Sequence, residues 1–260
     1  QIIASSRCKE KASKYDWFPK VKYLDYDINS NSDLNLFDYF NRPDRVIHLA
    51  WDGLPNYNNL IHIEKNLFNN YNFIKNLVSN GLNDISITGT CFEYGIVDGC
   101  LNESIRPNPS NSYAIAKDSL RKFINELKNQ YNFSYKWIRL FYMYGEGQNK
   151  NSLIAQLEEA IKIGEKEFKM SGGEQLRDYL YIKDVVSNIL KISLQNKIDN
   201  QIINCCSGKS ISVKDFVESY LKEKQLKIKL NLGYYPYSKH EPMNFWGDNS
   251  KLQKLLNNIS

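Results

Sequence analysis

The fold class follows from the run Asp-Ile-Ser-Ile-Thr-Gly-Thr at residues 84–90. This run is short and rich in β-branched side chains, which predicts a buried strand over Asp84–Thr90. Two longer stretches flank it, Asn58–Ser79 before and Asn111–Gln130 after, and both repeat apolar side chains at steps of three and four residues. That spacing predicts two amphipathic helices. A buried strand between long helices is typical of a parallel sheet covered by helices.

The same alternation extends through the first half of the chain. Further β-branched runs predict strands at Gln1–Ala4, Val21–Asp25, Arg45–Ala50 and Tyr135–Leu140. After residues 145–147 the predicted helices are shorter and more isolated, at Ser152–Ile163, Ile182–Leu194, Val213–Glu223 and Lys251–Asn257. Ser212, with Asp215 three residues later, is the expected cap of the third of these helices. We expect an α/β chain with a smaller α+β region in its second half.

Composition narrows the class of protein. Of the 260 residues, 42% are hydrophobic and 24% are charged, as in globular proteins and unlike disordered or collagen-like chains. The net charge is +5, but the basic residues are spread along the chain rather than gathered into one stripe, so we expect no nucleic-acid partner. No apolar run approaches the roughly 20 residues that a membrane helix needs, so we expect no membrane partner.

The cysteines and histidines predict neither a disulfide framework nor a metal site. The five cysteines contain no Cys-x-x-Cys pair, and the adjacent Cys205 and Cys206 are poorly placed for a mutual bridge. The three histidines stand in no zinc-binding spacing. Unpaired cysteines suit a reducing compartment, so we expect a cytoplasmic protein without a bound metal ion.

One Tyr-x-x-x-Lys pair is the candidate catalytic centre. Tyrosine and lysine one helical turn apart lie side by side, where the ammonium lowers the pKa of the phenol and suits it for proton transfer. Five of the 18 tyrosines have this spacing, so the surroundings decide between them. Tyr113 alone follows a turn-rich segment and opens a long amphipathic helix, which also carries Lys117. The hydroxyl of Thr90, at the end of the central strand, stands where open α/β sheets place reactive groups.

Five motifs stand in a recognisable order, at Val46–Ala50, Ser86–Gly95, Pro107–Lys117, Arg139–Gly145 and Arg177–Val185. Their order and spacing resemble the extended short-chain dehydrogenases/reductases, within them the nucleotide-sugar epimerases, dehydratases and reductases. The resemblance implies a Rossmann-like doubly wound parallel sheet with a smaller α+β substrate domain. It implies an NAD(P)-binding domain at residues 1–145 and a mainly substrate-binding domain at residues 146–260. A segment near residues 182–204 is expected to return to the first domain.

The resemblance also implies roles for single residues. Tyr113 would exchange a proton with the sugar hydroxyl or carbonyl, Lys117 would lower its pKa and bind the nicotinamide ribose, and Thr90 would hydrogen-bond the same sugar oxygen. Arg177 would bind the nucleotide diphosphate, to which a guanidinium is suited, with a structural salt bridge as the alternative. The residues expected to line the cofactor are Asp27, Ile28, Leu49, Ala50, Trp51 and Asn66.

The other expected substrate contacts depart from the family pattern. Related 4,6-dehydratases carry Asp-Glu after the catalytic threonine, but Cys91 and Phe92 stand here, which argues against dehydration. Cys91 is either a packing residue or a second proton carrier for epimerisation. Tyr142 stands where the family carries an asparagine that contacts the substrate, so the sequence does not decide whether Tyr142 makes this contact. The irregular, aromatic-rich stretch that begins at His240 either closes over the sugar nucleotide or caps the smaller domain.

The end of the first predicted strand bears on the cofactor. NAD-preferring relatives carry a carboxylate there, which binds the adenosine 2'-hydroxyl. Here Ser5, Ser6 and Arg7 supply two hydroxyls and a guanidinium, which suit a 2'-phosphate. We therefore expect NADP(H) rather than NAD(H). This favours a reductase, because a one-way ketone reduction is usefully coupled to NADPH.

Three functions compete on these grounds. The favoured one is the NADPH-dependent reduction of a nucleotide-linked 4-keto-(6-deoxy)hexose, since the sequence is similar to dTDP-4-keto-6-deoxyhexose reductases. The alternatives are a nucleotide-sugar 4-epimerase with bound NAD and a non-catalytic cofactor-sensing protein. Related enzymes pair through the two long helices at Asn58–Ser79 and Asn111–Gln130, so the resemblance also implies a homodimer.

The beginning of the sequence differs from the family pattern. Relatives begin with a strand and a Gly-x-x-Gly-x-x-Gly turn, and none of the 13 glycines forms such a turn before Ala4. Gln1–Ala4 corresponds instead to the second strand of the family. We expect about 25 to 30 residues to precede Gln1. We also expect the 260-residue piece alone to fold marginally and to bind cofactor poorly.

Overall fold

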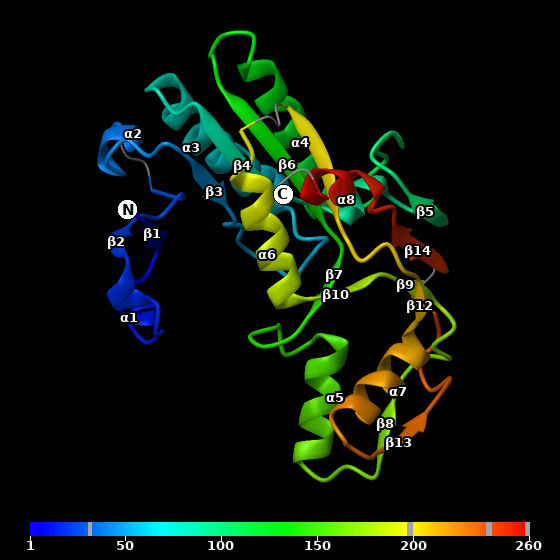
Figure 1. Cartoon of the computed structure of the whole chain (residues 1–260). Coiled ribbons are helices and arrows are strands. Elements are labelled where there is room, and N and C mark those ends of the chain that lie inside the picture. Colours follow the sequence, from blue (N-terminus) through cyan, green and yellow to red (C-terminus); the bar gives the residue numbers. More distant parts are fainter. Residues whose placement is uncertain (31–32, 197–199, 238–240, 258–260) are drawn as a thin grey trace. The chain divides into compact units, whose positions relative to one another are not determined.

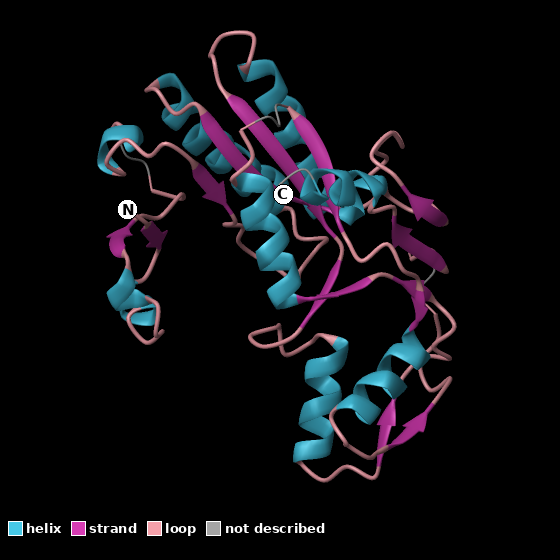
Figure 2. Cartoon of the chain, viewed as in Figure 1, coloured by secondary structure: helices cyan, strands magenta, loops and turns pink. Residues whose placement is uncertain are grey.

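The computed structural model describes residues 1–30, 33–196, 200–237 and 241–257 (Figure 1). The chain divides into two compact units, and each unit is made of separate pieces of sequence. The first consists of residues 1–87 and 111–135, and the second of residues 88–110 and 136–260. Helices and strands occur in both units (Figure 2). The predicted division after residue 145 stays a prediction.

The first unit contains the segments on which the expected cofactor residues lie. Strands β1 and β2 pair in parallel, and helices α3 and α4 pack side by side (Figure 1). The elements that lie wholly in this unit are β1 (Ile3–Ser6), α1 (Lys9–Ala12), a 3-10 helix (Phe18–Lys20), β2 (Lys22–Asp25), α2 (Leu36–Tyr39), β3 (Val46–His48), a π-helix (His62–Asn66), α3 (Leu67–Ser79) and α4 (Ser112–Leu127).

Two strands, β4 (Asp84–Thr90) and β6 (Ser134–Leu140), begin in the first unit and end in the second. They are the central strands of a four-stranded sheet with the hydrogen-bonded order β11-β6-β4-β3. Strand β3 pairs with β4 in parallel, and β11 (Gln201–Cys205) pairs with β6 in parallel. The predicted α/β class with parallel strands is thus confirmed.

The second unit is richer in short elements. Strand β14 pairs in parallel with both β5 and β9, and β12 pairs with β9 in the antiparallel direction. Two further parallel pairs are formed by β10 with β7 and by β13 with β8. The remaining elements are a 3-10 helix (Cys91–Tyr94), β5 (Gly99–Leu101), β7 (Tyr142–Tyr144), α5 (Leu153–Lys162), β8 (Glu167–Lys169), β9 (Leu176–Arg177), β10 (Tyr179–Tyr181), α6 (Ile182–Ser193), β12 (Ile211–Ser212), α7 (Val213–Glu223), β13 (Lys229–Asn231), β14 (Asn244–Gly247) and α8 (Ser250–Asn257).

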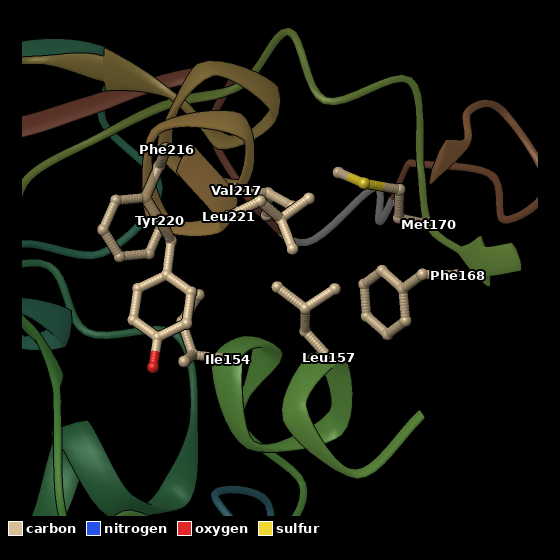
Figure 3. Packing of buried hydrophobic residues seen from close by; sticks show 8 residues of the cluster. All are labelled: Ile154, Leu157, Phe168, Met170, Phe216, Val217, Tyr220 and Leu221. Atoms are coloured by element: carbon tan, nitrogen blue, oxygen red, sulfur yellow. The ribbon is translucent and has the colours of Figure 1, made fainter. Parts of the chain in front are cut away.

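A compact apolar cluster joins α5, α7 and the β8 region of the second unit (Figure 3). Helix α7 contributes side chains one turn apart, which is why its sequence shows a 3.6-residue apolar period. The N–H of Asp215 is bound by Oγ of Ser212 at 3.0 Å, so the predicted cap of α7 is confirmed. The buried members of the cluster are Ile154, Leu157, Phe168, Met170, Phe216, Val217, Tyr220 and Leu221.

Two sequence predictions are wrong in instructive ways. The helix predicted from Asn58 starts only at His62, because residues before it form turns in which Oδ1 of Asn59 accepts the N–H of Ile61 at 2.9 Å. Asparagine side chains commonly compete with helix in this manner. The stretch after His240, predicted to be irregular, contains the strand β14, whose Phe245 side chain is buried. His240 itself lies outside the described residues.

Candidate active site

Helix α4 presents the predicted tyrosine–lysine pair in its first turns. Oδ1 of Asn111 accepts the N–H of Ala114 at 2.9 Å and thereby caps the helix, so Tyr113 stands at its second position. Lys117 follows one turn later, and both side chains are buried. The structure thus places the predicted phenol and ammonium one turn apart on one helix, and their role in proton transfer stays a prediction.

The loop after β3 covers this pair within the first unit. The N–H of Tyr113 donates to the carbonyl of Tyr57 at 2.9 Å, and the two rings lie 5.7 Å apart. The Trp51 ring centroid is 5.9 Å from that of Tyr113 and 4.1 Å from Nζ of Lys117. Trp51, which the sequence assigns to the cofactor, therefore touches both members of the pair.

Strand β3 ends at a second buried group, His48. Its Nε2 donates to Oδ1 of Asn70 at 2.6 Å. Burial, and to a lesser extent the positive charge of Lys117, lower the pKa of His48 to about 4, although the hydrogen bond with Asn70 acts in the opposite direction. The imidazole is therefore neutral at physiological pH and adds no second charge beside Lys117.

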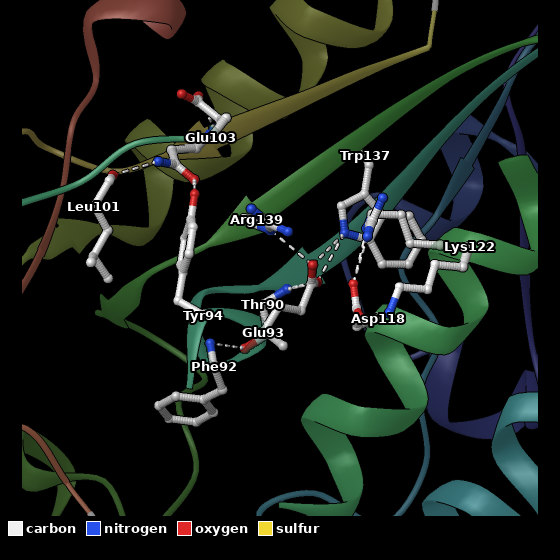
Figure 4. Close-up of polar contacts among 12 residues, drawn as sticks. Thr90, Phe92, Glu93, Tyr94, Leu101, Glu103, Asp118, Lys122, Trp137 and Arg139 are labelled. Carbon is white, nitrogen blue, oxygen red and sulfur yellow. Dashed lines mark hydrogen bonds and ion pairs between the residues drawn. The ribbon is translucent and has the colours of Figure 1, made fainter. Parts of the chain in front are cut away.

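Thr90 ends strand β4 in the second unit and caps the 3-10 helix that follows. Its Oγ1 accepts the N–H of Phe92 at 3.3 Å, which leaves the hydroxyl proton for another acceptor. The carboxylate of Glu93 reaches back to the N–H of Thr90 at 2.9 Å and completes a capping box (Figure 4). This local structure holds the backbone of Thr90 from both sides.

Glu93 is a residue that the sequence reasoning missed. It also accepts from Nε1 of Trp137 at 2.9 Å and from Nε of Arg139 at 2.8 Å, entirely within the buried interior (Figure 4). Gly89 makes room for this network, because a Cβ there would lie 2.2 Å from Nε1 of Trp137. The spacing Thr-x-x-Glu is a recognised capping signal and could have revealed Glu93.

The predicted substrate residues of the second unit do gather together. The ring of Phe92 lies 6.1 Å from that of Tyr142, and the Arg177 guanidinium lies 5.6 Å from the Tyr142 ring. Burial raises the pKa of Tyr142 well above its ordinary value, so its hydroxyl is neutral. Burial, together with the nearby Glu93 and Asp178 carboxylates, also raises the pKa of the Cys91 thiol, and a thiol that stays protonated suits a packing residue.

Arg177 is almost fully buried and is already paired. Its Nη2 lies 3.1 Å from Oε2 of Glu241, and its Nη1 donates to the carbonyl of Leu176 at 2.9 Å. The Glu241 side chain remains 54% exposed. The structural salt bridge that the sequence leaves open is thus present, with a partner that solvent or a ligand can reach.

Asp178 is a second group missed by the sequence reasoning. Its carboxylate accepts the N–H groups of Ser207 and Gly208 at 2.7 and 2.9 Å and ties the turn after β11 to β9 and β10. Burial raises its pKa, while these N–H groups act in the opposite direction. Asp178 supports the backbone that carries its neighbour Arg177.

The expected adenosine contacts lie at the end of β1. Arg7 forms a two-pronged ion pair with Asp52, in which Nη1–Oδ2 is 2.9 Å and Nη2–Oδ1 is 3.4 Å. Both side chains are well exposed. Oγ of Ser6 lies 2.7 Å from the Tyr23 hydroxyl, and Ser5 is exposed. The guanidinium that the sequence assigns to a 2'-phosphate therefore has a carboxylate partner that competes with phosphate.

The other expected cofactor residues also lie in the first unit. Oδ1 of Asp27 accepts the N–H of Asn29 at 2.9 Å and shapes the turn that contains Ile28. Leu49 and Ala50 are exposed after β3, where the chain leaves the sheet. Nδ2 of Asn66 donates to the carbonyl of Asp52 at 2.9 Å, so Asn66 holds the loop that carries Trp51.

These residues fit a dinucleotide cofactor. Loops from the carboxyl ends of β1, β2 and β3 carry the expected contacts, and such ends are where parallel sheets bind nucleotides. The buried ammonium of Lys117 beside the phenol of Tyr113 is a donor set suited to a ribose diol. Within the described residues, no helix is long and apolar enough to cross a membrane.

Two curated proteins of Aggregatibacter actinomycetemcomitans are similar along most of their length. One is a dTDP-6-deoxy-L-talose 4-dehydrogenase (NAD(+)), 29% identical over 225 residues, which are 85% of this chain and 81% of that protein. The other is a GDP-6-deoxy-D-talose 4-dehydrogenase, 27% identical over 84% of this chain and 74% of that protein.

Solved structures share the fold. The UDP-glucuronic acid 4-epimerase of Bacillus cereus, solved with UDP-glucuronic acid and NAD, matches with a TM-score of 0.77 at 22% identity, over 95% of this chain and 78% of that one. The UDP-N-acetylglucosamine 4-epimerase of Methanobrevibacter ruminantium matches with a TM-score of 0.82 at 21% identity, over 97% and 83% of the two chains. These matches confirm the predicted Rossmann-like fold.

A family match covers most of the sequence. Residues 3–206 match the family described as "NAD dependent epimerase/dehydratase family". That span includes the Tyr113–Lys117 pair, Thr90 and Arg177. The chain therefore belongs to the NAD dependent epimerase/dehydratase family.

Proposed function

We propose that this protein is an oxidoreductase that reduces a nucleotide-linked 4-keto-(6-deoxy)hexose with NADPH. The observation that carries the proposal is the buried Tyr113–Lys117 pair in the first turns of α4. Both curated relatives described above are named as 4-dehydrogenases of nucleotide-linked 6-deoxytaloses, and their reaction is the reverse of a 4-keto reduction. Membership of the NAD dependent epimerase/dehydratase family supports NAD-dependent chemistry, which this proposal shares with the epimerase alternative.

Side chains of the protein transfer the proton that the reduction requires. The phenol of Tyr113 donates its proton to the sugar carbonyl oxygen while the charge of Lys117 stabilises the phenolate that remains. The family resemblance assigns the Thr90 hydroxyl to the same sugar oxygen, and because its own oxygen accepts from Phe92, its proton is left to donate. When bound, the cofactor supplies the hydride that the carbonyl carbon receives. Water then returns the proton to Tyr113.

On the substrate side, Arg177 would receive the nucleotide diphosphate. A guanidinium binds phosphate oxygens through paired N–H donors, and the aromatic faces of Tyr142 and Phe92 lie close by. Cys91 and Phe92 stand where dehydratases carry their acid and base, which supports reduction over elimination of water. The phosphate would replace the exposed carboxylate of Glu241 on Arg177.

For the cofactor we propose NADP(H) in preference to NAD(H). Ser5, Ser6 and Arg7 supply donors for a 2'-phosphate, and exposed ion pairs such as Arg7–Asp52 contribute only about 0–1 kcal/mol. A phosphate can therefore exchange with Asp52. The name of one relative specifies NAD(+), so the ratio of kcat/KM for NADPH and NADH tests this preference.

The reaction is tested with purified protein and dTDP-, GDP- and UDP-linked 4-keto-6-deoxyhexoses. We expect consumption of NADPH only with a keto sugar, and a loss of at least about a hundredfold in kcat in Tyr113→Phe. Tyr235→Phe is the matched control, because Tyr235 also precedes a lysine by four residues but is exposed. Equal rates for Tyr113→Phe and the wild type would refute the assignment.

A nucleotide-sugar 4-epimerase is the second candidate. It is favoured by the two 4-epimerase structures described above, and it would use the same tyrosine to remove and return a proton. An epimerase retains oxidised NAD through purification and converts one sugar nucleotide into its 4-epimer without net use of cofactor. A non-catalytic sensing protein would instead bind cofactor and turn over none of these sugars.

We also propose a homodimer paired through α3 and α4. These neighbouring helices leave large apolar side chains exposed, namely Phe68, Ile115 and Phe123. Exposed apolar groups of this size are typical of protein interfaces. Sedimentation of the wild type should give the mass of two chains, and Phe123→Lys with Phe68→Lys should give the mass of one.

A further inference from the structure

The indole of Trp51 connects the proposed catalytic pair with a buried histidine. Its ring lies under the Lys117 ammonium at 4.1 Å and against the Tyr113 ring at 5.9 Å. Its Nε1–H donates to Nδ1 of His62 at 3.1 Å. One side chain thus contacts the ammonium through its face and the imidazole through its edge.

His62 has a single arrangement of donors and acceptors in this network. Its Nε2 faces the carbonyl of Asn56 at 3.0 Å and therefore donates, while Nδ1 accepts from Trp51 and lies 3.3 Å from Nδ2 of Asn66. The ring is thus the neutral tautomer with hydrogen on Nε2. The side chain is fully buried, and its ring centroid lies 5.4 Å from that of Tyr113.

The backbone around His62 is shaped to fit this imidazole. Residues 62–66 form a π-helix, a conformation that is rare and frequent at functional sites. Gly53 has a φ of +81°, and a Cβ there would lie 3.3 Å from Cε1 of His62. Nδ2 of Asn66 holds the carbonyl of Asp52 at 2.9 Å. The loop that carries Trp51 is therefore fixed at several points against His62.

We propose that Trp51 is a positioning residue that holds the Lys117 ammonium beside Tyr113, and that His62 keeps the indole in place. This inference rests on the proposed function, in which Tyr113 transfers the proton. A lysine has a long flexible stem, and a tryptophan face attracts a cation most strongly where water is excluded. Lys117 and Tyr113 are both buried here.

The charge of Lys117 determines the effect of this contact on Tyr113. A nearby cation favours the phenolate, so an ammonium that drifts away or loses its proton leaves a weaker acid. The titratable groups described around the pair include Tyr57, whose ring lies 5.7 Å from that of Tyr113, His48, which is neutral, and His62, whose donor pattern is that of the neutral ring. Removing the Trp51 side chain would therefore change the surroundings of the Lys117 ammonium without removing a charge.

The kinetic test compares Trp51→Leu, which removes the aromatic face and the N–H, with Trp51→Phe, which keeps a face. We expect the apparent pKa in the pH profile of kcat to rise by about one unit in Trp51→Leu, with kcat about tenfold lower. Trp51→Phe should show a smaller rise. Trp17→Leu, an exposed tryptophan of the same unit, is the matched control and should leave the profile unchanged.

His62 is tested by rescue. His62→Asn keeps an acceptor near the position of Nδ1, whereas His62→Leu leaves the Trp51 N–H without one. We expect His62→Leu to raise the apparent pKa as Trp51→Leu does, and His62→Asn to stay near the wild type. If His62→Leu lowered kcat without changing the apparent pKa, the role of His62 would be purely structural and the inference would be overturned.

A second measurement does not depend on turnover. In protein labelled at the lysine Cε, the signal of Lys117, assigned from its loss in Lys117→Met, should titrate at lower pH in Trp51→Leu than in the wild type. Equal titration overturns the inference even if Tyr113→Phe is inactive. If Tyr113→Phe keeps full activity the proposed function fails, and a shifted Lys117 titration would still support the contact. If Trp51→Leu does not fold, Trp51→Phe and the His62 pair decide the outcome.

Discussion

The Glu93 carboxylate and the Arg139 guanidinium form an ion pair with Oε2 and Nε 2.8 Å apart, and neither side chain is exposed to solvent. The Arg139 guanidinium also lies 4.4 Å from the Tyr94 ring, and its Nη1 and Nη2 have no hydrogen-bond partner among the described residues. Glu93 is therefore the group that compensates a buried positive charge. The same carboxylate holds the backbone of Thr90.

Glu93→Gln should lower the free energy of unfolding by about 3 kcal/mol, because it leaves Arg139 as an uncompensated buried charge. Urea denaturation measures this change. The control is Glu218→Gln, which breaks an exposed contact with Lys214 of 3.8 Å and should cost less than about 1 kcal/mol. Similar losses in the two variants would contradict the role given to Glu93.

Glu241→Gln should strengthen binding of a nucleoside diphosphate by about three- to tenfold. The variant removes a carboxylate that competes with phosphate for Nη2 of Arg177. Isothermal titration with dTDP, GDP and UDP measures the effect, with Glu165→Gln as an exposed control. If binding became weaker instead, Glu241 would be holding Arg177 in its binding position. Arg177→Gln should weaken binding in either case.

Asp52→Asn should raise the kcat/KM ratio of NADPH to NADH by several-fold. It keeps the side-chain shape but releases Arg7 from its anionic partner, so the guanidinium is left for a 2'-phosphate. Arg7→Ala should lower the same ratio. Steady-state kinetics with each cofactor measures both variants, and an unchanged ratio in both would remove Arg7 from the cofactor site.

His48 should make the folded protein sensitive to mild acid. Burial lowers the pKa of His48 to about 4, whereas an unfolded histidine titrates near 6.5. Between these values the unfolded chain binds more protons, so the free energy of unfolding falls as pH decreases, by about 1 kcal/mol per pH unit. Urea denaturation between pH 7 and pH 5 measures this slope. His48→Gln should flatten it, and an equal slope in both proteins would contradict this.

The spacing of apolar residues predicted those helices and strands whose bounds depend on neighbouring residues in the sequence. The strand Asp84–Thr90 and the helix Val213–Glu223 have the predicted bounds, because each has a continuous apolar pattern and a clear boundary. The Tyr113–Lys117 pair is singled out among five such spacings by its surroundings, a turn-rich segment followed by a long amphipathic helix. The helix expected from Asn58 starts late because asparagine side chains bind the backbone in turns there.

Contacts between distant residues could not be found in this way. The approach of Trp51 to Lys117 requires a loop from one strand to fold over a helix 66 residues later. Likewise, Glu241 meets Arg177 across 64 positions, and strands of two or three residues such as β9 and β7 exist only through their partners. No periodicity encodes such pairs, since each depends on the packing of the whole unit.

The discontinuous make-up of the two units has a consequence for biosynthesis. The first unit needs residues 111–135, and so it cannot be complete until the ribosome has passed Tyr135. The piece that arrives last includes α4, with Tyr113 and Lys117. Before α4 has been synthesised, α3 lacks the helix that packs against it. Its apolar side chains are then exposed in the nascent chain, where chaperones can bind them. The segment that completes the first unit is therefore also the segment that carries the proposed proton-transfer pair.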